Sequence, residues 1–280
     1  MTRALRFIVV AVLLLDASTV LSQSFYAIRR ERSVIGYVGV GSANYLGELS
    51  NPASLNIVKP SFNLGLEHYL NRRISARVEG YYYQIAGNDK LADNSRIVRN
   101  LSFFSNNIEL NASGVLNLLP NGRRFYQRQT INFYGFIGIG FTYINPKTTY
   151  NGQTIALQPV KTEGVHYSKF QPVIPFGGGM RLKMGPFFNL VVEAGLRRTF
   201  TDYLDDVSSA TYADPATLGS DLARALNNRS DGKASVRGNP NSVDYYFLMT
   251  GKLQYYLPYD LSALKRNKLY TQKRKYYRRR

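Results

Sequence analysis

Apolar and polar residues alternate along eight runs of this chain. In 73–84, for example, Ile74 and Val78 share one column of the run, while Arg77 and Glu79 share the other. Because successive side chains of a strand point to opposite faces, this alternation predicts strands with one apolar and one polar face. The predicted strands cover 34–43, 61–70, 73–84, 102–118, 131–144, 171–184, 187–200 and 243–257.

The connections between these runs alternate in length. The second connection is Asn71-Arg72, the sixth is Gly185-Pro186, and the fourth (119–130) is intermediate. Outer-membrane barrels have an even number of strands, short periplasmic turns and long extracellular loops. We therefore predict an all-β fold, an eight-stranded antiparallel transmembrane β-barrel of the outer-membrane type with both ends in the periplasm. The long polar connections, on the extracellular side, are 44–60, 85–101, 145–170 and 201–242.

Aromatic residues near the ends of the predicted strands favour this barrel over the alternative, a soluble β-sandwich. Transmembrane barrels carry aromatic girdles at both membrane interfaces. We expect the aromatic residues to form these girdles. The positions are Tyr69, Tyr81, Tyr82, Tyr83, Phe103, Phe104, Phe133, Tyr134, Tyr143, Phe187, Phe188, Phe200, Tyr245, Tyr246, Tyr255 and Tyr256.

Nine charged residues fall on the polar columns, which face the lumen of the predicted barrel. An eight-stranded barrel has room only for side chains, and unpaired buried charges are costly. We therefore expect an ion-pair network that plugs the lumen; the alternative, a proton or ion path, is disfavoured by the narrow bore. The nine residues are Glu67, Arg77, Glu79, Glu109, Arg181, Lys183, Glu193, Arg197 and Lys252.

The first 22 residues resemble a cleaved signal peptide. Arg3 and Arg6 precede an apolar stretch (7–15) that is too short to span a membrane as a helix. The sequence contains no cysteine, which excludes a lipoprotein anchor and thiol chemistry. We divide the chain into a signal peptide, a periplasmic N-terminal segment, the outer-membrane barrel and a basic periplasmic tail. Their ranges are 1–22, 23–33, 34–257 and 258–280.

Charge is concentrated in the C-terminal tail. The formal net charge is +18, and the last twenty residues (261–280) contain nine Lys or Arg and no acidic residue. We expect the tail to bind an acidic partner in the periplasm; a solvated, disordered tail is the alternative. A nucleic-acid partner is not expected for an exported barrel. The basic residues are Lys265, Arg266, Lys268, Lys273, Arg274, Lys275, Arg278, Arg279 and Arg280.

The candidates for catalysis and metal binding are few. The two histidines, His68 and His166, are predicted to lie on opposite sides of the membrane, so they form no catalytic or metal site together. We expect no enzyme, no cofactor and no small-molecule substrate. Asp202, Asp205 and Asp206 are a weak candidate for a Ca²⁺ site, because Asp side chains also cap turns and short helices. In the same connection, 218–226 has the apolar spacing of a helix that could cover the barrel's outer mouth.

Several local motifs resemble the PorG family, outer-membrane β-barrels of the type IX secretion and gliding machinery of Bacteroidetes. They lie in 99–103, 145–147, 157–164, 174–179 and 198–208. The resemblance covers most of the mature chain. Its most specific part consists of Thr199, Phe200, Thr201, Asp202, Tyr203, Leu204, Asp205 and Asp206.

The resemblance implies a non-enzymatic outer-membrane component that anchors the periplasmic PorK/PorN ring. Its partners would be outer-membrane lipid and the ring proteins, and no catalytic residue belongs to the family pattern. The alternative is a stand-alone surface barrel, an adhesin or a small transport barrel, that acts through its extracellular loops.

Overall fold

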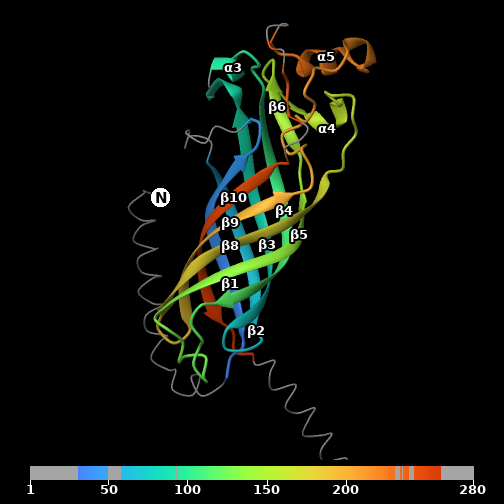
Figure 1. Ribbon diagram of the computed structural model, residues 1–280. Coiled ribbons are helices and arrows are strands. Elements are labelled where there is room, and N and C mark those ends of the chain that lie inside the picture. Colours follow the sequence, from blue (N-terminus) through green and yellow to red (C-terminus); the bar gives the residue numbers. More distant parts are fainter. Residues whose placement is uncertain are drawn as a thin grey trace, which may run out of the picture.

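The computed structural model describes residues 31–49, 58–91, 94–230, 234, 236–239 and 243–259. Within these ranges, eight long antiparallel strands close into a barrel (Figure 1). Each strand pairs with the next one, and the barrel closes where β1 pairs with β10, with Ile35 opposite Tyr256. The predicted fold class is therefore confirmed. The strands are β1 (Val34–Leu46), β2 (Lys59–Tyr69), β3 (Ile74–Asn88), β4 (Ser102–Asn117), β5 (Ile131–Tyr143), β8 (Phe170–Met184), β9 (Phe188–Thr199) and β10 (Tyr245–Tyr256).

Alternation along the strands separates an apolar outer surface from a polar interior. Leu64 and Ile139 point outward and are 66% and 73% exposed, whereas Arg77 and Glu193 point inward and are each 2% exposed. Similar outward apolar residues lie on all eight barrel strands. A continuous apolar band of this kind would be unstable in water but matches the hydrocarbon core of a bilayer. The band therefore favours the membrane barrel over the soluble sandwich.

The structure also contains a hairpin that the sequence analysis assigned to a loop. Within the fifth predicted connection (145–170), β6 (Pro146–Tyr150) pairs with β7 (Gln153–Ala156), and β6 also pairs with the end of β4. The turn is Asn151-Gly152, with φ of 49° and 77°. An Asn-Gly turn with two positive φ angles is the preferred connection of a two-residue hairpin. The sheet thus continues beyond the end of the barrel that carries the long connections, which we name the outer end.

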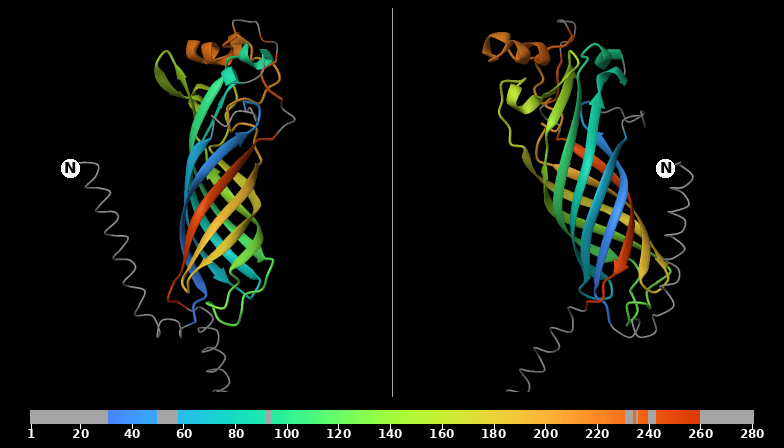
Figure 2. Two further views of the ribbon diagram at one scale, coloured as in Figure 1. Left: turned by 90° about the vertical axis from the view of Figure 1, so that its left-hand side faces the viewer. Right: turned by 180° about the vertical axis from the view of Figure 1, so that it is seen from behind.

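Short helices lie in the connections on this same side. The predicted helix in 218–226 is present as α5, where Ala223 and Leu226 are buried. Figure 2 shows α5 and the β6–β7 hairpin at one end of the barrel, opposite the end where β1 begins and β10 stops. None of the helices in the described part of the chain is long and apolar enough to cross a membrane. The helices are η3 (Asp89–Leu91), α3 (Asn94–Ile97), α4 (Leu157–Val160), η4 (Pro215–Thr217) and α5 (Asp221–Asn227).

The prediction that these aromatic residues form girdles on the outer surface is wrong for about half of them. Tyr82 and Phe133 face outward and are 49% and 54% exposed, but their chain neighbours Tyr81 and Tyr134 are buried in the lumen. Adjacent residues of a strand point to opposite faces, so a run of aromatics supplies both the surface and the interior. The inward-facing or otherwise buried members are Tyr81, Tyr83, Phe103, Tyr134, Phe187, Tyr246 and Tyr256.

Candidate functional site

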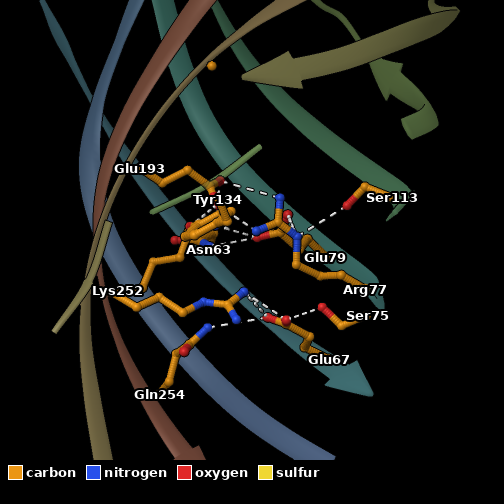
Figure 3. A network of polar contacts seen from close by, with 12 residues as sticks. Asn63, Glu67, Ser75, Arg77, Glu79, Ser113, Tyr134, Glu193, Lys252 and Gln254 are labelled. Carbon is orange, nitrogen blue, oxygen red and sulfur yellow. Dashed lines mark hydrogen bonds and ion pairs between the residues drawn. The ribbon is translucent and has the colours of Figure 1, made fainter. Parts of the chain in front are cut away.

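Four charged side chains meet in the middle of the lumen (Figure 3). Arg77 Nε lies 2.8 Å from Glu79 Oε2, and Arg77 Nη1 lies 2.5 Å from Glu193 Oε2. Lys252 Nζ bridges the same two carboxylates, at 2.6 Å from Glu79 and 2.7 Å from Glu193. Tyr134 also donates to Glu193 at 2.6 Å. Two cations and two anions thus neutralise each other across the barrel.

A second ion pair lies nearer the inner end, on the side of the short turns. Arg181 donates twice to Glu67, at 2.7 and 2.9 Å. This guanidinium also reaches Asn117 Oδ1 at 3.0 Å, and Ser75 donates to the carboxylate. Figure 3 shows Glu67 between Ser75 and Gln254. Both bonds to Glu67 come from Nη2, and together with the bond from Nη1 to Asn117 they hold the guanidinium in one orientation.

A third pair lies nearer the outer end. Arg197 Nε is 3.7 Å from Glu109 Oε1, and Arg197 donates to the carbonyl of Gly195 at 2.9 Å. Glu109 accepts hydrogen bonds from Tyr246 at 2.7 Å and from Asn111 at 2.6 Å. Polar side chains therefore fill the barrel over three successive levels.

The structure brings eight of the nine predicted lumen residues into these three groups. The ninth, Lys183, is only partly buried at the inner end, where Nζ donates to the carbonyl of Tyr126 at 2.8 Å. Lys183 lies near the end of β8 and forms no ion pair within the described residues, so it does not belong to the network. The sequence analysis missed the hydroxyls of Tyr81 and Tyr134. The alternation places Tyr81 on the polar column, which was the available signal.

At the outer end, Tyr45 joins two buried carboxylates of the connection between β9 and β10. Its hydroxyl lies 2.8 Å from Asp205 Oδ2 and 2.5 Å from Asp244 Oδ1. A hydroxyl has one hydrogen, so one of these contacts requires a proton on a carboxyl group. Burial raises the pKa of both Asp205 and Asp244 well above the usual range of an aspartate. This trio ties the seventh predicted connection to β1.

Asp206 holds a second cluster in the same region. Thr162 and Tyr167 donate to its two carboxylate oxygens, the latter at 2.7 Å. Nearby, Arg237 pairs with Glu163 at 2.8 Å and donates to Thr162 at 3.1 Å. Two segments that resemble the PorG family, 157–164 and 198–208, therefore pack together.

A third motif segment, 99–103, joins this network through Arg99. Its guanidinium pairs with Asp89 at 2.7 and 2.8 Å, and it donates to the carbonyls of Glu48 and Arg237. We refer to the clusters around Asp205, Asp206 and Arg99 together as the outer cap. Its apolar interior includes Leu204, completely buried.

The proposed Ca²⁺ ligands do not converge. Asp205 points to Tyr45, and Asp206 points to Thr162 and Tyr167. In the ranges that the structure describes, no group of three or more His, Asp or Glu side chains could hold a metal ion. Burial raises the pKa of Asp202 to about 7, which lowers its share of the ionised form that a cation would need.

The two histidines occupy opposite ends of the barrel. His68 Nδ1 lies 3.1 Å from the carbonyl of Ser33 at the inner end, and His166 Nε2 lies 3.2 Å from Gln158 Nε2 in the outer cap. Each ring thus has its own neighbours. Within the described ranges, neither histidine contacts both a nucleophilic side chain and a carboxylate, as a catalytic triad would require.

These features define an eight-stranded β-barrel of the outer-membrane type, with a lumen filled by side chains and an ordered cap at one end. The chain belongs to the DUF6089 family, described as a domain of unknown function, whose model matches residues 11–220. No curated protein matches the sequence.

Several solved outer-membrane barrels resemble the structure at low sequence identity. Neisserial surface protein A is 8% identical with a TM-score of 0.44, and 80% of this chain aligns with 97% of that one. Ail, the attachment invasion locus protein of Yersinia pestis, is 12% identical with a TM-score of 0.38, over 80% of this chain and 99% of that one. OprG from Pseudomonas aeruginosa is 10% identical with a TM-score of 0.37, over 82% and 100%. Similarity at this level has no bearing on function.

Proposed function

We propose that this protein is a non-enzymatic outer-membrane component of the type IX secretion and gliding machinery of Bacteroidetes, and that it anchors the periplasmic PorK/PorN ring. The observation that carries this proposal is the filled lumen, where Arg77, Glu193 and Lys252 are each at most 2% exposed. A barrel without a passage serves as a membrane support for partners at its ends. The choice of the type IX machinery as the assembly rests on the motifs that resemble the PorG family.

The orientation belongs to the same proposal. The outer cap would face the cell exterior, and the start of β1 and the end of β10 would face the periplasm. This assignment follows from loop lengths, since outer-membrane barrels have their short turns on the periplasmic side. The basic tail, 258–280, would then extend toward the ring; apart from Pro258 and Tyr259 it lies outside the described residues, as does the signal peptide.

Affinity purification of the tagged full chain from outer membranes, followed by mass spectrometry, tests the proposal. The full chain should recover the ring proteins, and a chain that ends at Tyr259 should recover fewer of them. If the full chain recovers no ring protein, the anchoring function is wrong. Unchanged recovery with the shortened chain would instead remove only the tail from the proposal.

The outer cap favours a second candidate, a surface barrel that acts through its loops. The buried contacts of Asp206 and Arg237 hold the seventh predicted connection in a defined shape, as a recognition surface requires. In this case, deletion of 209–239 should abolish surface attachment while protein secretion continues. Loss of secretion in the same strain would favour the anchoring function.

A further inference from the structure

The inner end of the barrel is strongly basic even without the tail. Its described segments are 31–33, 68–73, 118–130, 183–187 and 257–259. Glu31 is the one acidic residue within these segments. The basic residues are Arg32, Arg72, Arg73, Arg123, Arg124, Arg128 and Lys183. Among them, Arg72, Arg73 and Arg123 are exposed, and the side chain of Arg124 is 51% exposed beside Glu31.

A buried arginine gives the 118–130 connection a fixed shape. Arg128 donates to the carbonyls of Phe125, Pro186 and Phe188, at 3.2, 2.8 and 2.7 Å, and to Asn189 Oδ1 at 2.6 Å. Its guanidinium also lies 4.6 Å from the centre of the Tyr256 ring. These contacts fasten the connection to the turn between β8 and β9.

The same connection crosses the inner mouth of the barrel. The ring of Phe125 stacks on Phe187 at 5.9 Å and lies 5.5 Å from Tyr256. All three rings are at most 7% exposed and belong to one apolar cluster. Arg123, two positions before Phe125, therefore lies on a connection that spans the inner mouth.

Backbone hydrogen bonds join this connection to the β2–β3 turn. The amide of Asn121 donates to the carbonyl of Arg72 at 2.8 Å, and the amide of Asn117 donates to the carbonyl of Arg73 at 2.8 Å. The exposed arginines of the two connections thus belong to one rigid surface, which we name the inner arginine surface (Arg72, Arg73 and Arg123).

We propose that the inner arginine surface docks an acidic face of a periplasmic protein. A concentrated positive field accelerates association with an acidic partner and favours it over a neutral or basic one. A protein occupant fits better than lipid headgroups, because Arg123 lies on the connection that spans the inner mouth, between Asn121 at the β2–β3 turn and Phe125 in the apolar cluster. The identity of the partner as the secretion ring rests on the proposed function; the acidic docking partner rests on these residues.

The test uses the full chain in nanodiscs of neutral lipid and the ring proteins purified from the same cells as the probe. Charge reversal in the triple variant R72E/R73E/R123E should weaken ring binding at least about tenfold and flatten its dependence on salt. The variant R72Q/R73Q/R123Q should give an intermediate loss. The matched control reverses three exposed basic residues of the outer side, in the variant K90E/K161E/R224E, and should bind like the wild type.

The outcomes separate the two proposals. If the wild type and R72E/R73E/R123E bind the ring equally, the docking surface is wrong while the anchoring function stands. If the wild type does not bind the ring, the anchoring function fails and the docking proposal fails with it. Equal ring binding together with weaker binding to nanodiscs of phosphatidylglycerol would assign the arginines to lipid headgroups. Unchanged circular dichroism confirms that each variant is folded.

Discussion

Glu193 is one of the two carboxylates that hold the middle of the lumen together. It accepts from Arg77, Lys252 and Tyr134, and these partners come from three different strands. The other carboxylate at this level, Glu79, contacts the same two cations. One anion cannot neutralise two buried cations, so the network requires both carboxylates.

Replacement of Glu193 by glutamine should therefore destabilise the barrel. We expect Glu193→Gln to lower the free energy of unfolding by about 3 kcal/mol, because it leaves a buried positive charge uncompensated. Unfolding by urea in lipid vesicles measures the change, with tyrosine fluorescence as the signal since the chain has no tryptophan. The matched control is Asp221→Asn, whose side chain is 96% exposed although it pairs with Arg224, and which should cost less than about 1 kcal/mol. Equal effects of the two substitutions would contradict the role of Glu193.

The proton shared around Tyr45 makes the outer cap sensitive to pH. Burial raises the pKa of Asp205 and Asp244 well above normal, and it raises the pKa of Glu48, nearby, to about 8. A carboxyl group whose pKa is higher in the folded cap stabilises the cap in acid. This stabilisation is lost as the pH rises through the folded-state pKa.

We expect amide hydrogen exchange in 202–207 to become faster from about pH 5 to about pH 8, after correction for the intrinsic pH dependence of exchange. Arg99 remains positively charged at both pH values, whereas Asp202, whose pKa is about 7, also ionises over this range and adds to the effect. The variant Asp244→Asn should show a smaller pH dependence because it removes one of the carboxyls that titrate at this site. Slower exchange at the higher pH would contradict the shared proton.

At the scale of elements, the outer cap is held by polar contacts between connections. Glu163 accepts from the amides of Ser208 and Ser209, at 3.1 and 3.2 Å, and pairs with Arg237. These bonds link the fifth and seventh predicted connections. Their loss should loosen the cap without opening the barrel, because no barrel strand contributes to them.

The substitution Glu163→Ala should make 201–239 more susceptible to limited proteolysis, with the strands remaining resistant. A buried arginine without its partner adds to the effect, since the side chain of Arg237 is 2% exposed. Asp214→Ala is the comparison, because Asp214 only caps the short helix η4 within the same connection. If both variants are digested at the wild-type rate, Glu163 does not hold the cap.

The strands were predictable from sequence because alternation is a local pattern. The observed β4 and β5 differ from the predicted runs by one residue at one end. The β6–β7 hairpin was missed although Asn151-Gly152 marks its turn, since its strands of five and four residues show little alternation. The role of Arg128 was not predictable, because most of its partners are backbone carbonyls, which carry no sequence signal, and its side-chain partner Asn189 is 61 positions away.

The candidate site was predictable only in part. Which charged residues face the lumen follows from alternation, but which of them pair depends on the register and tilt of strands far apart in sequence. Arg77 and Glu193, for example, are 116 positions apart. The three aspartates of the seventh connection looked like metal ligands because they are close in sequence. In the structure their side chains diverge toward different partners.

At the scale of the whole molecule, the barrel is closed along its entire length. Phe125 and Arg128 close the inner mouth, ion pairs fill the middle, and the outer cap covers the opposite end. The closed barrel separates a cap in which acidic and basic side chains pair, such as Asp89 with Arg99, from an inner end that is mostly basic. In the proposed function, partners bind at the two ends, and the barrel holds these ends across the membrane.

Conductance of the purified full chain in planar lipid bilayers tests the closed lumen most directly. We predict no steady open state above the baseline of the lipid, because moving an ion through the barrel would require the pairs of Arg77, Glu193 and Lys252 to separate. A steady, large conductance in the wild type would contradict the closed barrel and the supporting role proposed for it.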